Sequence, residues 1–290
     1  MNQSPPSPLI TADELADRLA GGSPPVLLDV RWTLSGGSDP VGYLAGHLPG
    51  ARFLDLDRDL AAPAGPGGRH PLPAPADLQA ALRAIGLNDG DGVVVYDGGP
   101  GLSAARAWWL LRWSGLRAVQ VLDGGLPAWT SGPDGDDGAV PTRPTRSGPA
   151  DPTRPGTITV TPGAMPVVDA DGAAAAAQAP GALLLDLRAA ARYRGEVEPL
   201  DPVAGHIPGA VNLPVAELMR ADGTYRPPAE VAERLAAAGV VTGTPVVASC
   251  GSGITACQLV LAAERAGIGA TLYPGSYSQW CALGRPVATG

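Results

Sequence analysis

The sequence predicts an α/β protein made of two tandem domains, each a mainly parallel sheet flanked by helices. Two observations support this fold class. Short apolar motifs occur twice in the same order, and in each copy Val- and Leu-rich runs alternate with helical stretches. Strands that are buried on both faces give continuous apolar runs, and parallel strands need a helical crossover between them. We therefore expect one fold, used twice.

Four pairs of motifs carry the repeat, with one member of each pair in each half of the chain. The spacing between matching motifs changes only slightly, as loop-length changes between two copies of one fold would produce. In chain order the pairs are VLLDVRW with GHLPGARFL against LLLDLR with GHIPGAVNL, VVVYD (Val93–Asp97) against VVASC (Val246–Cys250), and VQVLDGGLPAW against ATLYPGSYSQW.

The stretch between the copies is rich in proline, glycine and charge, which is typical of an exposed connector. We therefore predict a first domain over residues 1–130, a linker over 131–157 and a second domain over 158–290. The apolar stretches Ser103–Ser114 and Ile254–Gly267 are the helices expected to follow the second strand of each copy.

Composition excludes several classes of protein. The chain has a net charge of −8 and no lysine, so a nucleic-acid partner is not expected. No apolar run reaches the length of a membrane span, and the start lacks a basic segment followed by an apolar one, as a secretory signal would have. Three cysteines in 290 residues do not make a disulfide framework. We expect a reduced, cytoplasmic protein with no membrane contact.

Cys250 follows an apolar strand and precedes a helix, in the sequence VVASC-GSGIT-ACQ. In an open α/β sheet, ligands bind just past the carboxyl ends of the strands. Gly251 and Gly253 allow the backbone to curl, so that successive N–H groups can converge on one point. Those donors and the helix dipole favour an anion there, either a thiolate or a persulfide made from it.

An inert, buried cysteine is the alternative interpretation of Cys250, and the glycines and the Ser/Thr-rich loop argue against it. Cys257 on the following helix is most simply a small core residue, and Cys281 has no activating neighbours in the sequence. The first copy has Asp97 where Cys250 stands. We therefore expect chemistry in the second copy only.

The two-copy layout, the GHLPGA and GHIPGA motifs, the CGSGIT loop and the closing GSYSQW resemble the tandem-domain rhodanese-like sulfurtransferases. The resemblance covers nearly the whole chain. It implies two rhodanese-like domains, with an inactive N-terminal one and a cysteine persulfide in the C-terminal one. The C-G-S-G loop is similar to that of the 3-mercaptopyruvate enzymes. Thiosulfate, a dianion, needs cations nearby, and the loop itself contains none.

The resemblance also implies a proton relay of Ser252, His70 and Asp57, assembled across the interface between the two domains. A histidine can exchange a proton near neutral pH, and a carboxylate can fix its tautomer. The alternative is that His70 and Asp57 are ordinary loop and turn residues. His47 and His206 occur in the turn that both copies share, so a structural role is the simpler interpretation for them.

Arg192 matches the arginine that binds the donor carboxylate in the resembled family, where a guanidinium can hold the anion through two hydrogen bonds. Arg188 is a further candidate, although its pairing with Asp186 repeats that of Arg31 with Asp29 and favours a scaffold role. A second family arginine, which would follow Pro199, is absent here, and Arg194 is the candidate to replace it. The remaining substrate-binding candidates belong to the cysteine loop: Gly251, Gly253, Ile254 and Thr255.

These expectations together describe a double displacement. Sulfur passes from 3-mercaptopyruvate to Cys250, releasing pyruvate, and then to cyanide, a low-molecular-weight thiol or a thioredoxin-like protein. We expect no metal and no organic cofactor. Thiosulfate as donor and a non-enzymatic sulfur carrier or interaction module remain alternatives. A cysteine phosphatase is disfavoured because its loop has an arginine six residues after the cysteine, where this chain has Ala256.

Overall fold

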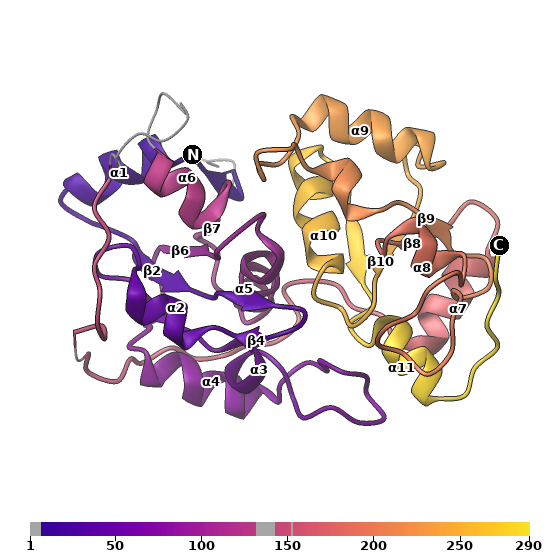
Figure 1. The fold of residues 1–290 in the computed structure, drawn as a ribbon, viewed down its shortest axis with the longest axis horizontal. Helices are drawn as coiled ribbons and strands as arrows, with labels where there is room; N and C mark the ends of the chain where they lie inside the picture. Colours follow the sequence, from indigo (N-terminus) through magenta and orange to yellow (C-terminus); the bar gives the residue numbers. More distant parts are fainter. Residues whose placement is uncertain (1–6, 132–142, 152) are drawn as a thin grey trace. The chain divides into compact units, whose positions relative to one another are not determined.

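The computed structural model describes residues 7–131, 143–151 and 153–290 (Figure 1). The chain divides into two compact units. The first contains 1–60, 73–164 and 221–224, and the second contains 61–72, 165–220 and 225–290. The segment Ala61–Leu72 therefore comes from the first half of the chain but packs in the second unit.

Five parallel strands form the sheet of the first unit, in the order β1, β7, β6, β2, β5. A short antiparallel pair, β3 with β4, lies outside this sheet. The bounds are β1 Leu9–Ile10, β2 Val26–Asp29, β3 Trp32–Thr33, β4 Gly37–Ser38, β5 Arg52–Phe53, β6 Val93–Tyr96 and β7 Val119–Leu122.

The second unit repeats this order with four parallel strands, β11, β10, β8, β9. A single parallel bridge between Val167 and Leu272 stands where β1 lies in the first sheet. The bounds are β8 Leu183–Asp186, β9 Val211–Asn212, β10 Val246–Ser249 and β11 Ala270–Leu272. The predicted fold, two α/β domains with parallel sheets, is confirmed.

The helices also correspond between the units in chain order. The first unit has α1 Ala12–Ala20, α2 Pro40–Ala45, α3 Leu56–Asp59, α4 Pro75–Ala84, α5 Leu102–Trp113 and α6 Gly125–Ser131. The second has α7 Ala170–Gln178, α8 Ala190–Tyr193, the 3-10 turn η1 Val215–Leu218, α9 Pro228–Ala237, α10 Ala256–Arg265 and α11 Ser276–Ala282. Among the described residues, no helix has the length and apolar character needed to cross a membrane.

Helix starts in the two units are fixed by similar local chemistry. Thr11 caps α1 in a reciprocal capping box with Glu14, and Asp169 caps α7 by accepting from the N–H of Gly172. Proline occupies the first helical position of both α4 and α9, where its missing N–H costs nothing. These signals place equivalent helices at equivalent points of each copy.

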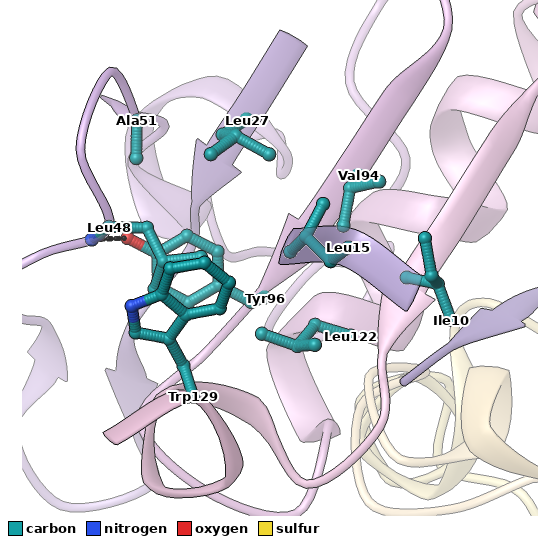
Figure 2. Close-up of a cluster of buried hydrophobic side chains, with 9 residues drawn as sticks. All are labelled: Ile10, Leu15, Leu27, Leu48, Ala51, Val94, Tyr96, Leu122 and Trp129. Atoms are coloured by element: carbon teal, nitrogen blue, oxygen red, sulfur yellow. Dashed lines mark hydrogen bonds between the residues drawn. The ribbon is translucent and has the colours of Figure 1, made fainter. Parts of the chain in front are cut away.

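Each sheet is covered on both faces, because alternate residues of a strand point to opposite sides. Figure 2 shows one face of the first sheet, where Val94 and Tyr96 pack with Leu15 of α1 and Trp129 of α6. The intervening β6 residues point to the other side, where α5 packs against β6 and β7. In the second unit the same layers are formed by α7 and α11 on one face and α10 on the other.

The turn motif shared by the copies has the same construction in both. His47 stacks on Tyr43 and its Nδ1 lies 2.8 Å from the Tyr43 carbonyl; His206 and Tyr193 repeat both contacts. Both histidines are buried. This is the arrangement expected of structural residues, in agreement with the prediction.

The predicted linker, residues 131–157, lies partly outside the described residues. Residues 132–142 and 152 lie outside the described residues. Ile158 and Thr161 bond to the first unit through the carbonyls of Leu87 and Ser114. The chain therefore leaves the first compact unit near residue 164. The boundaries predicted from sequence stay a prediction.

Candidate active site

Cys250 lies at the carboxyl end of β10, just before α10, at the edge of the sheet where ligands are expected. Gly253 adopts φ +79°, and a side chain there would collide with the Pro274 carbonyl. This left-handed turn brings the Gly253 N–H within 3.2 Å of the Cys250 sulfur, to which it donates. Cys250 is 2 % exposed, so its sulfur lies in a nearly enclosed environment that includes the Gly253 amide.

The first turn of α11 supports the cysteine loop. The Ser276 hydroxyl accepts from the Cys250 N–H at 3.1 Å, donates to the Tyr273 carbonyl at 2.9 Å and lies 4.0 Å from the Cys250 sulfur. The N–H groups of Tyr277 and Ser278 donate to the carbonyls of Cys250 and Gly251. Ser276 has φ +50°, an uncommon conformation for a residue with a side chain, and its two hydroxyl bonds stabilise it.

The equivalent loop of the first unit already contains an anion. The Asp97 carboxylate accepts from the N–H groups of Gly99, Gly101, Ser103 and Ala104 and from the Ser103 hydroxyl, at 3.0–3.2 Å. Gly101 has φ +80°, like Gly253, and its N–H donates to Asp97 as that of Gly253 donates to Cys250. The repeat therefore contains a loop whose amides converge on a negative charge.

Residues Gly68–His70, here called the GRH segment, bring two side chains of the first repeat to the cysteine loop within the second compact unit. The His70 Nδ1 lies 2.8 Å from the Ser252 hydroxyl. The structure thus brings together the predicted pair. The contact lies inside one compact unit, whereas the sequence predicted an assembly across a domain interface.

The segment is held against the start of α11. The Ser278 hydroxyl accepts from the Arg69 N–H at 3.1 Å. Gly68, at φ +104°, lies so close that a Cβ there would be 2.8 Å from the Ser278 hydroxyl oxygen and 2.9 Å from the Gly275 carbonyl. The close packing of Gly68 against Ser278 and Gly275 therefore fixes the position of the backbone that carries Arg69 and His70.

Two guanidinium groups lie over the cysteine loop. A Cβ placed on Gly251 would lie 2.9 Å from Arg69 Nη2 and 3.6 Å from Arg192 Nη1. The cations near the loop therefore include Arg192, as expected, and also Arg69, which sequence reasoning did not single out. The loop itself carries none, but Arg69 and Arg192 supply two from other parts of the chain.

Two carboxylates orient these arginines. Asp201 pairs with Arg69 and also with Arg192, and Glu198 binds Arg192 at 2.6 Å. Burial would raise the pKa of Glu198, but donation by Arg192 and by the N–H groups of Asp201 and Leu200 lowers it below its usual range. Burial raises the pKa of Asp201, and the attraction of Arg69 only partly opposes this.

The other two predicted arginines take different positions. Arg188 is enclosed: its guanidinium binds Asp186, Glu198 and the Gly205 carbonyl and lies over the Tyr277 ring. Arg31 makes the same bonds to Asp29 and the Gly46 carbonyl in the first unit, a repetition that favours a scaffold role for Arg188. Arg194 pairs with Glu196 in an exposed position.

The remaining loop candidates begin α10. Ile254 is buried, and Thr255 precedes the first residue of the helix without a side-chain cap. The first turn of α10 is already hydrogen-bonded, since the N–H groups of Cys257 and Gln258 donate to the carbonyls of Ile254 and Thr255. The Ile254 side chain faces the protein interior.

Asp57 belongs to the first compact unit. It lies in α3, and its carboxylate accepts from Trp32 Nε1 at 2.8 Å and from the Ser38 N–H at 2.9 Å. These bonds fix the position of the carboxylate. Its part in a relay with His70 stays a prediction.

The other two cysteines lack the environment of Cys250. Cys257 is fully buried in α10, and its thiol lies 3.3 Å from the Gly253 carbonyl. Burial raises the pKa of the Cys281 thiol, which disfavours its thiolate. Cys250, Cys257 and Cys281 are thiols that form no disulfide with one another.

Sequence reasoning missed four residues of this site: Arg69, Asp201, Ser276 and Ser278. One signal was available. In the closing motif the second copy has Ser276 and Ser278 where the first has Gly125 and Pro127, so the second copy adds hydroxyl groups beside its cysteine. Arg69 and Asp201 had no such signal, because their pairing joins distant parts of the chain.

Comparison with known proteins places these features in a family. The rhodanese-like domain matches residues 11–132 and 169–283. A Pseudomonas aeruginosa protein named "Probable 3-mercaptopyruvate sulfurtransferase" is 46 % identical, covering 97 % of this chain and 98 % of the relative. A Mycobacterium tuberculosis protein with a provisional name as a thiosulfate sulfurtransferase is 42 % identical, covering 97 % of both.

A solved structure gives the same result. The crystal structure of SseA from Escherichia coli, described as a 3-mercaptopyruvate sulfotransferase with the rhodanese fold, is 33 % identical. It aligns with a TM-score of 0.78 over 94 % of this chain and 99 % of that one. The resemblance drawn from the sequence motifs is therefore confirmed: this chain belongs to the rhodanese family and contains two rhodanese-like domains.

Proposed function

We propose that this chain is a sulfurtransferase that carries sulfur from 3-mercaptopyruvate, through a persulfide on Cys250, to a thiol or cyanide acceptor. The observation that carries the proposal is the pair of equivalent loops. In the first, amides bind the Asp97 carboxylate, whose charged oxygen is two bonds beyond Cβ. In a cysteine persulfide the charged outer sulfur is also two bonds beyond Cβ. The loop geometry therefore suits a persulfide anion at Cys250.

The first half-reaction conserves atoms and charge. The Cys250 thiolate attacks the sulfur of 3-mercaptopyruvate, the S–S bond forms and the C–S bond breaks with its electron pair leaving on carbon. The proton of the donor thiol is transferred to that carbon, giving pyruvate and the persulfide anion. Ser252 and His70, 2.8 Å apart, are the groups we assign to this proton transfer, with Asp57 as the predicted third member.

In the second half-reaction an acceptor attacks the outer sulfur and restores the Cys250 thiolate. A low-molecular-weight thiol would leave as its own persulfide, and cyanide would leave as thiocyanate. A thioredoxin-like protein is the proposed macromolecular acceptor. We place the reaction in the cytoplasm, where thiols stay reduced, and the lack of a disulfide among the three cysteines fits this.

Thiosulfate is the second candidate donor. Arg69 and Arg192 lie over the loop, so the cations that a dianion needs are at hand. The Mycobacterium tuberculosis relative carries a thiosulfate name, which also keeps this donor in view. The choice between the two donors rests on their relative kcat/KM.

The test is Cys250→Ser, assayed with both donors and cyanide, with Cys281→Ser as the matched control. We expect thiocyanate formation to fall to background with either donor in the first variant and to stay unchanged in the second. Mass spectrometry of the wild-type chain incubated with donor alone should show one added sulfur on the Cys250 peptide. Retained turnover in Cys250→Ser would overturn the proposal. A persulfide without turnover to any acceptor would favour a sulfur carrier.

A further inference from the structure

Two arginines from distant parts of the chain reach the same face of the cysteine loop. Arg192 belongs to α8 and Arg69 to the GRH segment, and the Gly251 position is within 4 Å of both guanidinium groups. Gly251 directly follows Cys250. An anionic group bound by both arginines would therefore lie beside the reacting sulfur.

The charges are arranged so that the accessible part of this cluster is cationic. The side chains of Arg69 and Arg192 are 25 % and 15 % exposed, whereas those of Asp201 and Glu198 are 2 % and 3 % exposed. Asp201 bonds to both arginines, one oxygen to each. The buried carboxylate therefore holds two guanidinium groups at a fixed spacing, while their remaining N–H donors stay available. Such preorganisation reduces the entropy cost of binding an anion.

Arg194, the candidate for the missing second arginine, does not have these properties. It is 45 % exposed and bound through two hydrogen bonds to Glu196, whose side chain is itself 55 % exposed. The segment after Pro199, Leu200-Asp201-Pro202, contains no arginine, whereas the resembled family has its second arginine there. The cation that reaches Gly251 beside Arg192 comes instead from the other repeat.

We propose that Arg69 is a donor-recognition residue, which binds the carboxylate of the sulfur donor together with Arg192 over the cysteine loop. This inference rests on the proposed function and deepens it. The GRH segment then has two roles, because Arg69 holds the anionic end of the donor while His70, the next residue, contacts Ser252. The docking of Gly68 on Ser278 sets the position of both.

The first experiment measures charge selectivity at Cys250 without turnover. Iodoacetate and iodoacetamide are similar in size and differ in charge, so the ratio of their alkylation rates, normalised to a free thiol, reports on cations near the sulfur. Alkylation of the Cys250 peptide is followed in the wild-type chain, in Arg69→Gln and in Arg194→Gln. We expect Arg69→Gln to lower the ratio about 10-fold, as loss of a charged hydrogen bond would. The exposed Arg194→Gln control should leave it unchanged.

The second experiment uses turnover. Arg69→Gln should raise KM for 3-mercaptopyruvate about 10- to 100-fold with a small change in kcat, and weaken inhibition by pyruvate to a similar extent. Equal slowing with both alkylating reagents, or a loss confined to kcat, would mean that Arg69 only supports the loop and would overturn the inference. Failure of the proposed function is distinguishable: the wild-type chain would then form no persulfide, while the alkylation ratio would still decide the role of Arg69.

Discussion

The loop after β6 and the loop after β10 are equivalent in the repeat. We call the first loop closed, because a carboxylate of the chain occupies its amides, and the second open, because Cys250 stands in place of that carboxylate. In the first, the chain supplies its own anion, and Asp97 occupies amides of Gly99, Gly101, Ser103 and Ala104. In the second, the short thiol of Cys250 accepts from the Gly253 N–H, while the first turn of α10 donates to the carbonyls of Ile254 and Thr255. The same backbone device therefore serves stability in one copy and suits a transient anion in the other.

The two loops also differ in the hydroxyl groups around them, which only the second copy has at the matching positions. Ser252 has Gly99 as its counterpart, and Ser276 has Gly125. The closed loop needs no hydroxyl groups, because its carboxylate is already satisfied. The open loop has Ser276 beneath the cysteine and Ser252 bonded to His70. Differences between the copies are thus concentrated around one sulfur atom.

The largest expected effect concerns the proton relay, which exists only on the open side. His70→Ala should lower kcat/KM for 3-mercaptopyruvate about 100-fold, the usual size of a general acid–base contribution. The loss with thiosulfate should be much smaller, because sulfite leaves without being protonated on carbon. Ser252→Ala should reproduce this donor dependence, measured by steady-state kinetics with cyanide as acceptor. Equal losses on both donors would reduce His70 to a structural role.

A second prediction tests the closed side. Asp97→Ala should lower the free energy of unfolding by about 3 kcal/mol, because it leaves several buried amides without a partner. Asp97→Asn, which keeps one acceptor oxygen, should lose less. Urea denaturation followed by fluorescence measures both, with Asp77→Asn on the exposed start of α4 as the control. If Asp97→Ala unfolded no more easily than the control, the first loop would not be an anion site.

The smallest expected effect concerns Glu198, which the second copy adds to the buried Asp–Arg pair that both copies share. The second copy adds Glu198, whose carboxylate binds Arg188 and Arg192 and has a pKa below its usual range. A lowered pKa stabilises the fold above the unfolded value, about 4.3, and the contribution is lost as the pH falls through the folded pKa. Glu198→Gln should therefore cost about 1.5–3 kcal/mol at pH 7.

The pH dependence separates charge from shape. The difference in unfolding free energy between the wild-type chain and Glu198→Gln should narrow as the pH is lowered below about 4, because the native carboxylate becomes protonated there. Asp55→Asn, which changes a carboxylate of the first unit, provides a comparison of equal charge. A difference that stayed constant as the pH was lowered well below 4 would mean that Glu198 acts through packing alone.

Much of this architecture could be predicted from sequence, because it is local. The motif pairs predict two sheets of the same strand order, and the glycines around Cys250 predict the left-handed turn that aims an amide at the sulfur. Arg69 could not be found this way. Its importance depends on Asp201, 132 residues away, and on the docking of Gly68 against Ser278. The resemblance to the family pointed to His70 but not to Arg69, the residue before it.

Arg188 and Arg194 illustrate the opposite limit. Both lie in the region that the resemblance assigns to donor binding, and the repeated Asp–Arg pairing gives a sequence signal for Arg188 but none for Arg194. Burial and partners distinguish both from Arg192: Arg188 is enclosed among Asp186, Glu198 and Tyr277, and Arg194 is bound to Glu196 at the surface. Which guanidinium faces the cysteine is a property of the folded chain, decided by the carboxylates around each.

The segment Ala61–Leu72 lies in the first half of the chain but packs in the second compact unit, so the second unit depends on residues from both halves. A gene split within the connector would give a later half that still encodes Cys250 and Ser252 but no longer carries Arg69 or His70. Recombination that swapped the later half alone would separate residues that must change together.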